Sequence, residues 1–168
     1  MTEQETAQRN AAERAAVVAE ARRWLGTPYH HEARVKGAGV DCAQLLIGVF
    51  SASGVALIDP PDVPRYPPDW HLHRSAERYL AIVLEHAHEI AGPPLPGDIV
   101  LWRFGRCFSH GAIVVDWPHV IHAYVGRACV IEDAEAAAWL SMIGERADGH
   151  GRARPRRFFS LWPASRIA

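Results

Sequence analysis

Cys42, His110 and His122 are the residues whose types and spacing best suit nucleophilic chemistry. A cysteine attacks as its thiolate, and helix N-terminal amides together with a nearby imidazolium lower the pKa of the thiol. Asp41 has the character of a helix N-cap, which places Cys42 in the first turn of a helix. A thiol nucleophile also needs a histidine that takes the proton and a polar group that orients the imidazole. His110 and His122 can fill these two roles.

The two histidines lie in neighbouring predicted strands. His110 opens the segment 110–116 and His122 lies within 120–124, with the turn-like sequence Asp-Trp-Pro-His at 116–119 between them. An antiparallel pair brings side chains of adjacent strands together, so we expect His122 to lie beside His110 and support it. The alternatives are ordinary hydrogen-bonded sheet histidines and, for Cys42, a buried structural thiol.

The elements that must position these residues are helices first and strands second. A helix capped by Asn10 and Glu13 is predicted to run to about Leu25, and a second from Asp41 to Gly54. A proline-rich surface insertion at 59–68 precedes a third helix over about 70–90. Strands are predicted at 98–104, 110–116, 120–124, 129–132 and 158–162. This order indicates an α+β fold.

Length and composition narrow the class of protein. The 168 residues suit one domain, 1–168, with 49% hydrophobic and 22% charged residues. A formal net charge of −1 gives no general attraction to nucleic acid or anionic membrane. No stretch reaches the roughly 20 apolar residues that span a bilayer, and Met1 to Glu20 lack the pattern of a secretory signal. The three cysteines do not suggest a disulfide scaffold, and Cys107 and Cys129 match no catalytic feature.

Ten histidines raise a metal site as an alternative. Residues two apart on a helix do not share a face, so an H-x-H pair there is a poor ligand set. No complete ligand group with familiar spacing occurs, and we expect neither a metal nor another cofactor. The candidates are His71/His73, His86/His88 and Cys107/His110.

Five ordered motifs carry a family resemblance over about residues 15–135. They are WLGTPY at 24–29, DCAQL at 41–45, PGDIVLW at 96–102, SHGAIVV at 109–115 and VIHAY at 120–124. In this order they resemble the NlpC/P60 family of bacterial cell-wall peptidases. The resemblance implies a papain-like fold, with N-terminal helices packed on a central antiparallel β-sheet.

The resemblance implies roles for single residues. Cys42 matches the nucleophile, His110 the base and His122 the residue that orients it. Tyr29, Asp41 and Ser109 match positions that line the substrate site, although helix capping alone also explains Asp41. The family cleaves peptidoglycan stem peptides, commonly between D-glutamate and the diamino acid, through a thioester. The oxyanion would meet the backbone amide of Cys42 and the Tyr29 hydroxyl.

Two departures from the family pattern bear on the expected setting. Ala43-Gln44 replaces the usual Ser-Gly after the cysteine, and no signal peptide or cell-wall-binding repeat is visible. The chain is similar to the phage-tail and gene-transfer-agent branch, which implies a tail component that is made in the cytoplasm, contacts other tail proteins and opens the recipient's wall. A CHAP-like amidase that cleaves the sugar-peptide amide, and a catalytically silent tail-hub subunit, stay open as alternatives.

Overall fold

The computed structural model describes residues 2–56, 77–134, 142–143 and 152–163. Its helices are α1 Glu3–Arg22, α2 Cys42–Ala52, α4 Arg78–His86 and the 3-10 turn η2 Val125–Arg127. The strands are β1 Arg34–Val35, β2 Gly39–Val40, β3 His88–Ile90, β4 Ile99–Phe104, β5 Cys107–Asp116, β6 His119–Tyr124, β7 Cys129–Asp133, β8 Met142–Ile143, β9 Arg152–Ala153 and β10 Arg156–Ser160.

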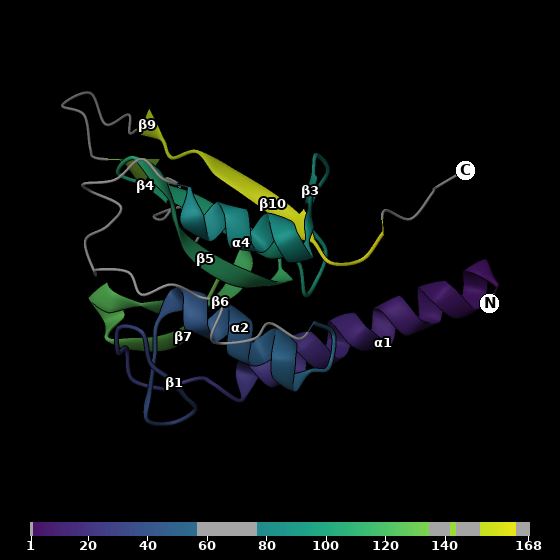
Figure 1. Ribbon diagram of the computed structural model, residues 1–168, viewed down its shortest axis with the longest axis horizontal. Coiled ribbons are helices and arrows are strands. Elements are labelled where there is room, and N and C mark those ends of the chain that lie inside the picture. Colours follow the sequence, from purple (N-terminus) through teal and green to yellow (C-terminus); the bar gives the residue numbers. More distant parts are fainter. Residues whose placement is uncertain (1, 57–76, 135–141, 144–151, 164–168) are drawn as a thin grey trace.

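A six-stranded antiparallel sheet organises the fold. Its strand order is β3-β10-β4-β5-β6-β7, and α2 packs against β5 and β6 while α1 packs against α2 (Figure 1). The α+β architecture, with N-terminal helices packed on an antiparallel sheet, is therefore confirmed. At its N-terminal end α1 extends beyond the sheet (Figure 1).

Both faces of the central strands are covered by apolar side chains. Residues Ile99 to Trp102 of β4 are all buried, which is why this strand reads as a continuous apolar run. The larger cluster lies between the helices and the sheet and includes Leu45 and Phe50 of α2. A smaller cluster contains Val100, Trp102, Ala112, Val114 and Val120.

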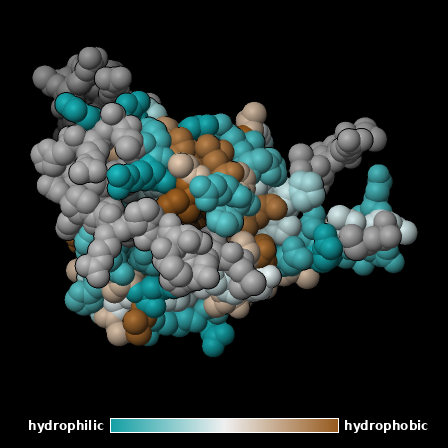
Figure 2. Space-filling model, viewed as in Figure 1, coloured by the Kyte–Doolittle hydropathy of each residue, from teal (hydrophilic) through white to brown (hydrophobic). Residues whose placement is uncertain are grey.

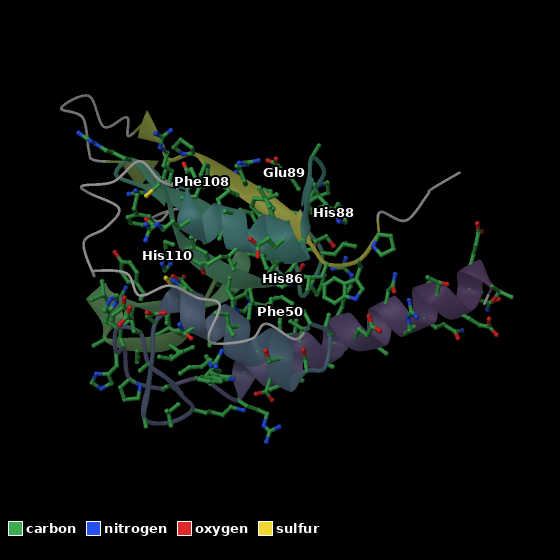
Figure 3. The ribbon with its side chains drawn as sticks, viewed as in Figure 1. Phe50, His86, His88, Glu89, Phe108 and His110 are labelled. Atoms are coloured by element: carbon green, nitrogen blue, oxygen red, sulfur yellow. The ribbon has the colours of Figure 1, made fainter. Side chains whose placement is uncertain are left out.

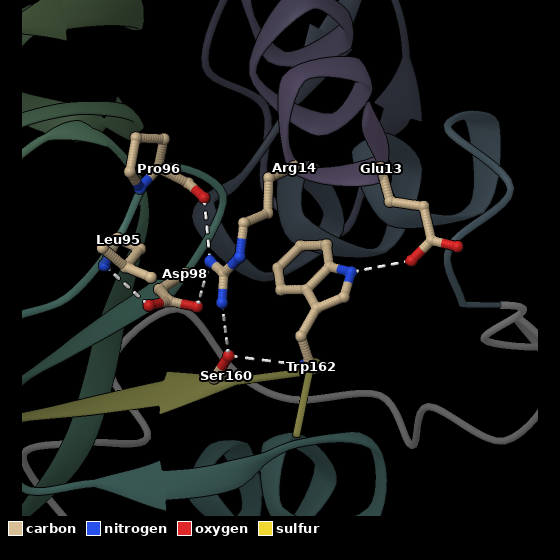
Figure 4. Close-up of polar contacts among 7 residues, drawn as sticks. All are labelled: Glu13, Arg14, Leu95, Pro96, Asp98, Ser160 and Trp162. Carbon is tan, nitrogen blue, oxygen red and sulfur yellow. Dashed lines mark hydrogen bonds and ion pairs between the residues drawn. The ribbon is translucent and has the colours of Figure 1, made fainter. Parts of the chain in front are cut away.

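The N-terminal helix is tied to the sheet by a group of polar contacts that we call the Arg14 clamp: Arg14, Asp98, Ser160 and Trp162 (Figure 4). The Arg14 guanidinium donates to Asp98 Oδ1 over 2.8 Å and to Ser160 Oγ over 3.0 Å. It also lies over the Trp162 ring, 4.1 Å from the centroid. The clamp joins α1 to the start of β4 and the end of β10.

An apolar pocket opens between α2 and α4, on the face where apolar side chains gather in Figure 2. Phe50 and His86 both line it, and they lie near each other in Figure 3. Ala43 also contributes to its lining, so the pocket reaches the residue that follows Cys42. Among the described lining residues, His86 and Tyr79 carry titratable side chains and the others are apolar.

Three predicted boundaries are corrected by the structure. The capping box of α1 is Thr2 with Glu5, not Asn10 with Glu13, because the helix begins at Glu3. Strand β5 begins at Cys107, so His110 lies inside the strand and does not open it. The helix predicted over 70–90 is described only as α4, Arg78–His86; residues 88–90 form β3, and 70–76 lie outside the described residues, as does the insertion at 59–68.

Candidate active site

Cys42 is the first residue of α2, and its position is set by the residue before it. Asp41 has an extended backbone and is the N-cap: its Oδ1 accepts from the Gln44 amide over 2.9 Å. Its Oδ2 accepts from the Glu32 amide over 2.8 Å. Because both carboxylate oxygens are bound, this end of α2 is held firmly against the preceding loop.

The sulfur of Cys42 lies against β5 on both sides of His110. It contacts the Ser109 carbonyl at 3.7 Å, and the Gly111 amide is close enough to lower the pKa of the thiol. The register of β5 with β4 shifts here, from the pair Trp102–His110 to the pair Arg103–Phe108, so Ser109 lies at an irregularity of the strand. Figure 3 shows His110 near the end of α2 that Cys42 begins.

His110 and His122 are in direct contact, as the strand order predicted. His110 Nε2 lies 2.8 Å from His122 Nδ1. Both side chains are buried, and His122 is 0% exposed. The Tyr124 ring lies 5.5 Å from that of His110 and 5.8 Å from that of His122, between centroids. Since Nε2 of His110 is engaged by His122, the nitrogen left to take a proton from a thiol is Nδ1.

Strand register explains why the two rings meet. Ile113 pairs with Ile121 and Val114 with Val120. Continuing this register places His122 and His110 on one face and diagonal to each other, within reach of ring side chains. The pairing of β5 with β6 covers Ile113 to Asp116, so His110 lies beyond that ladder, where α2 approaches the strand.

Asp133 joins the histidines from β7, and the sequence did not single it out. Its Oδ2 lies 3.6 Å from His122 Nε2, a contact longer than a normal hydrogen bond. Val120 pairs with Asp133 and His122 with Ile131, so Asp133 is diagonal to His122 on the same face. The strand predicted at 129–132 stopped one residue short of Asp133, because aspartate disfavours strands. We call His110, His122 and Asp133 the histidine row.

Burial keeps the thiol and the imidazole neutral at rest. It raises the pKa of Cys42 to about 12, and the charge of Asp41 acts in the same direction. The amides of Gly111, Ala43 and Cys42 oppose this rise. Burial also lowers the pKa of His110 well below its usual range, and the charges of His122 and Arg154 lower it further. The lowered thiol pKa expected of a helix N-terminus is thus outweighed by desolvation.

Residues expected to line a substrate site surround Cys42 to different degrees. Burial raises the pKa of the Tyr29 hydroxyl, with smaller contributions from Cys42 and Asp41, so all three lie close together. His31 Nδ1, which the sequence did not single out, is 3.7 Å from Asp41 Oδ2. The Ser109 hydroxyl donates to the Phe104 carbonyl over 3.5 Å, so Ser109 meets Cys42 through its backbone carbonyl.

Tyr79 of α4 supports the start of α2. Its hydroxyl donates to the Cys42 carbonyl over 3.2 Å. A Cβ atom at residue 111 would lie 2.2 Å from that hydroxyl, so only glycine fits between β5 and Tyr79. The sequence carried no signal for this contact, because it depends on how α4 packs over β5.

Among the described residues, thiols and histidines outside this site show no sign of a second centre. All three cysteines are free, and Cys107 is buried, which raises the pKa of its thiol. Among the described residues no group of three or more His, Cys, Asp or Glu is arranged to hold a metal ion. His86 and His88 are both exposed, and the pair His71/His73 lies outside the described residues. No described helix is long and apolar enough to cross a membrane.

Comparison with solved structures identifies a fold that this chain shares. It is similar to NlpC2 from Trichomonas vaginalis, with a TM-score of 0.54 and 15% identity over 87% of this chain and 47% of that one. It is also similar to the peptidoglycan hydrolase RipB from Mycobacterium tuberculosis, with a TM-score of 0.53 and 13% identity over 90% and 66% of the two chains.

A third similar structure is an NLP/P60-family protein described as similar to lipoprotein, from Staphylococcus aureus. Its TM-score is 0.51, with 16% identity over 87% of this chain and 41% of that one. This chain thus spans between 41% and 66% of the length of these three structures. No family model and no curated protein matches the sequence. Identities this low show a shared fold, which is that of NlpC/P60 peptidoglycan hydrolases.

Proposed function

We propose that this protein is a cysteine endopeptidase that hydrolyses peptide bonds in peptidoglycan stem peptides. One observation carries the proposal: the Cys42 thiol, at a helix N-terminus, lies against the strand backbone on both sides of His110, whose outer nitrogen is 2.8 Å from His122. A thiol, a buried base and a group that orients the base are the parts that covalent acyl transfer needs. The shared fold supports the substrate class.

The proposed reaction proceeds through a thioester. The Cys42 proton passes to Nδ1 of His110 as the sulfur attacks the carbonyl carbon, and the backbone amide of Cys42 stabilises the oxyanion. The C–N bond then breaks, and the amine leaves with the proton from His110. Water hydrolyses the thioester, which releases the acid and restores the thiol. Because burial and nearby charges raise the pKa of Tyr29, its hydroxyl stays protonated and can also donate to the oxyanion.

We assign Asp41 and Tyr29 to the free amino end of the stem peptide. Asp41 is 1% exposed and lies beside Cys42, where its charge raises the pKa of the thiol. A bound ammonium group would offset that charge and so lower the thiol pKa when substrate is present. This assignment favours cleavage between D-glutamate and the diamino acid, the bond cut by the family that the motifs resemble.

The test is mass spectrometry of purified muropeptides and free stem peptides after incubation with the protein. Cys42→Ala is run in parallel, with Cys129→Ala as the matched control because Cys129 is a free, half-buried thiol outside the site. We expect products ending at D-glutamate with the unmodified protein and with Cys129→Ala, and none with Cys42→Ala. Metal chelators should not change the rate.

Other products would redirect the assignment. Separated sugar and peptide would indicate an amidase of the CHAP type. Full activity in Cys42→Ala would exclude the thioester mechanism. If no substrate is cleaved, the protein is better explained as a silent structural subunit of a tail hub.

We further propose that the enzyme acts from the tail of a phage or gene-transfer particle, where it opens the recipient's wall. This rests on the resemblance of the segment 41–45, Asp-Cys-Ala-Gln-Leu, to that branch of the family. Mass spectrometry of purified particles should find the chain in tail fractions at a fixed ratio to other tail proteins. Its presence only in cell extracts would contradict this setting.

A further inference from the structure

The histidine row crosses three adjacent strands. His110 on β5 contacts His122 on β6 at 2.8 Å, and His122 contacts Asp133 on β7 at 3.6 Å. His122 is fully buried, and the Asp133 side chain is 11% exposed. The row therefore leads from the candidate base to a carboxylate near the surface.

The chemistry of the three groups determines where the protons sit. A hydrogen bond between two neutral imidazoles needs one N–H and one bare nitrogen. His122 Nε2 faces a carboxylate, which can only accept, so this nitrogen carries the proton of His122. Its Nδ1 is then bare and accepts from Nε2–H of His110. As a result Nδ1 of His110 is also bare, which is the form needed to take the proton of Cys42.

We propose that Asp133 is a positioning residue that acts through His122: it sets the tautomers of both histidines and stabilises the cation formed when His110 accepts the thiol proton. This inference rests on the proposed function, because it assumes that His110 is the base. Asp133 does not touch the reacting atoms. Two buried histidines, His110 and His122, lie between its carboxylate and the Cys42 thiol.

The surrounding charges fit this role. Burial lowers the pKa of His122 to about 4, and Asp133 opposes that fall. At the other end of the row Arg154 lowers the pKa of His110. Among the described residues, the titratable or charged groups that act on the two rings include Tyr124, Asp133 and Arg154, and Cys42 contacts the backbone beside His110. Among them Asp133 is the anion that contacts His122.

The test compares Asp133→Asn with Glu132→Gln. Glu132 is the adjacent acid on β7, but it pairs with Arg22 at 3.0 Å and His119 at 3.3 Å, away from the histidine row. We expect Asp133→Asn to lower turnover on the order of 10²-fold, because misplacing a histidine tautomer impairs general-base catalysis. Glu132→Gln should stay close to the unmodified protein.

Two readouts separate positioning from a merely structural role. Nitrogen NMR of the imidazole rings should find the proton of His122 on Nε2 in the unmodified protein. In Asp133→Asn a larger fraction of the molecules should carry this proton on Nδ1. The pH profile of Cys42 alkylation by iodoacetamide should move to higher pH in Asp133→Asn, because the imidazolium that accompanies the thiolate is less stable. Unchanged tautomer and alkylation profiles would overturn the proposal.

A double-variant cycle tests the route through His122. In a His122→Gln background, adding Asp133→Asn should cost little further turnover, whereas a structural role would cost the same in both backgrounds. If Asp133→Asn does not fold, NMR of the unmodified protein decides, and a proton on Nδ1 of His122 overturns the proposal. These ring and thiol measurements need no peptide substrate, so failure to cleave stem peptides would count against the proposed function alone.

Discussion

The Arg14 clamp and the histidine row are both largely buried polar groups that join distant parts of the chain, but their polar atoms are accommodated in different ways. In the clamp, opposite charges meet directly: Arg14 and Asp98 are 2.8 Å apart, and the second Asp98 oxygen accepts from the Leu95 amide at 2.8 Å. In the row, two imidazoles stay neutral because burial lowers their pKa values.

The two arrangements predict different roles for the clamp and the row. A buried ion pair whose remaining lone pairs are hydrogen-bonded holds elements together, and removing one partner leaves an uncompensated charge. A neutral imidazole can act as a base toward a thiol, although burial opposes the transfer because it lowers the imidazole pKa and raises the thiol pKa. The clamp should therefore govern stability and the row should govern activity.

The largest expected effect is the loss of turnover in Cys42→Ala, by at least about 10⁴-fold, because no other group supplies the nucleophile. His110→Ala should be nearly as severe, and His122→Ala less so, because an orienting group is less critical than the base. Single-turnover assays on stem peptides give these rates. The thermal unfolding temperature of Cys42→Ala should stay close to that of the unmodified protein. A large shift would contradict the expectation that this site governs activity and the clamp governs stability.

Breaking the clamp should have the opposite result. Arg14→Met leaves the Asp98 carboxylate buried without its cation and should lower the free energy of unfolding by about 3–5 kcal/mol. Arg9→Met is the matched control, because Arg9 makes an exposed contact with Glu13 at 3.5 Å and should change stability by less than about 0.5 kcal/mol. Urea unfolding measures both, and turnover per folded molecule should be retained in each variant.

Acid should destabilise the protein through the histidine row. Below about pH 6.5 the histidines of the unfolded chain bind protons, whereas the buried rings of the folded protein stay neutral. The free energy of unfolding is therefore highest above about pH 6.5. It falls as the pH decreases toward the pKa in the folded protein, which is about 4 for His122. Each such histidine contributes a slope of about 1.4 kcal/mol per pH unit within this window. Urea unfolding at several pH values should show a shallower slope for His122→Gln than for the exposed control His86→Gln; equal slopes would contradict the assignment.

A smaller effect separates two roles of Asp41. Asp41→Asn keeps the oxygen that caps α2 but loses the acceptor for the Glu32 amide, so the free energy of unfolding should fall by about 1–3 kcal/mol. Removing the charge should lower the pKa of Cys42 and speed its alkylation at neutral pH. If Asp41 binds the substrate's amino end, KM should rise for free stem peptides but not for N-acetylated ones. An equal KM for both would leave Asp41 as a cap.

Local patterns were enough to locate Cys42 and to bring His110 and His122 together. Asp41 and Gln44 mark a helix start within four residues, and the short turn between β5 and β6 leaves few registers for the histidines. Segment 88–90 was read as helix because its strand character depends on pairing with β10, about 70 residues later in the chain. Such a partner leaves no trace in the local sequence.

Residue type and short-range spacing therefore determined the α+β class, the position of Cys42 at the start of a helix and the contact of His110 with His122. Tertiary packing decided the rest. Asp133 became part of the row only through the register of β7, Gly111 through the approach of Tyr79, and the Arg14 clamp through contacts across 84 and 146 positions. The protonation states also depend on packing, because burial reversed the thiol pKa shift that the helix N-terminus alone predicts.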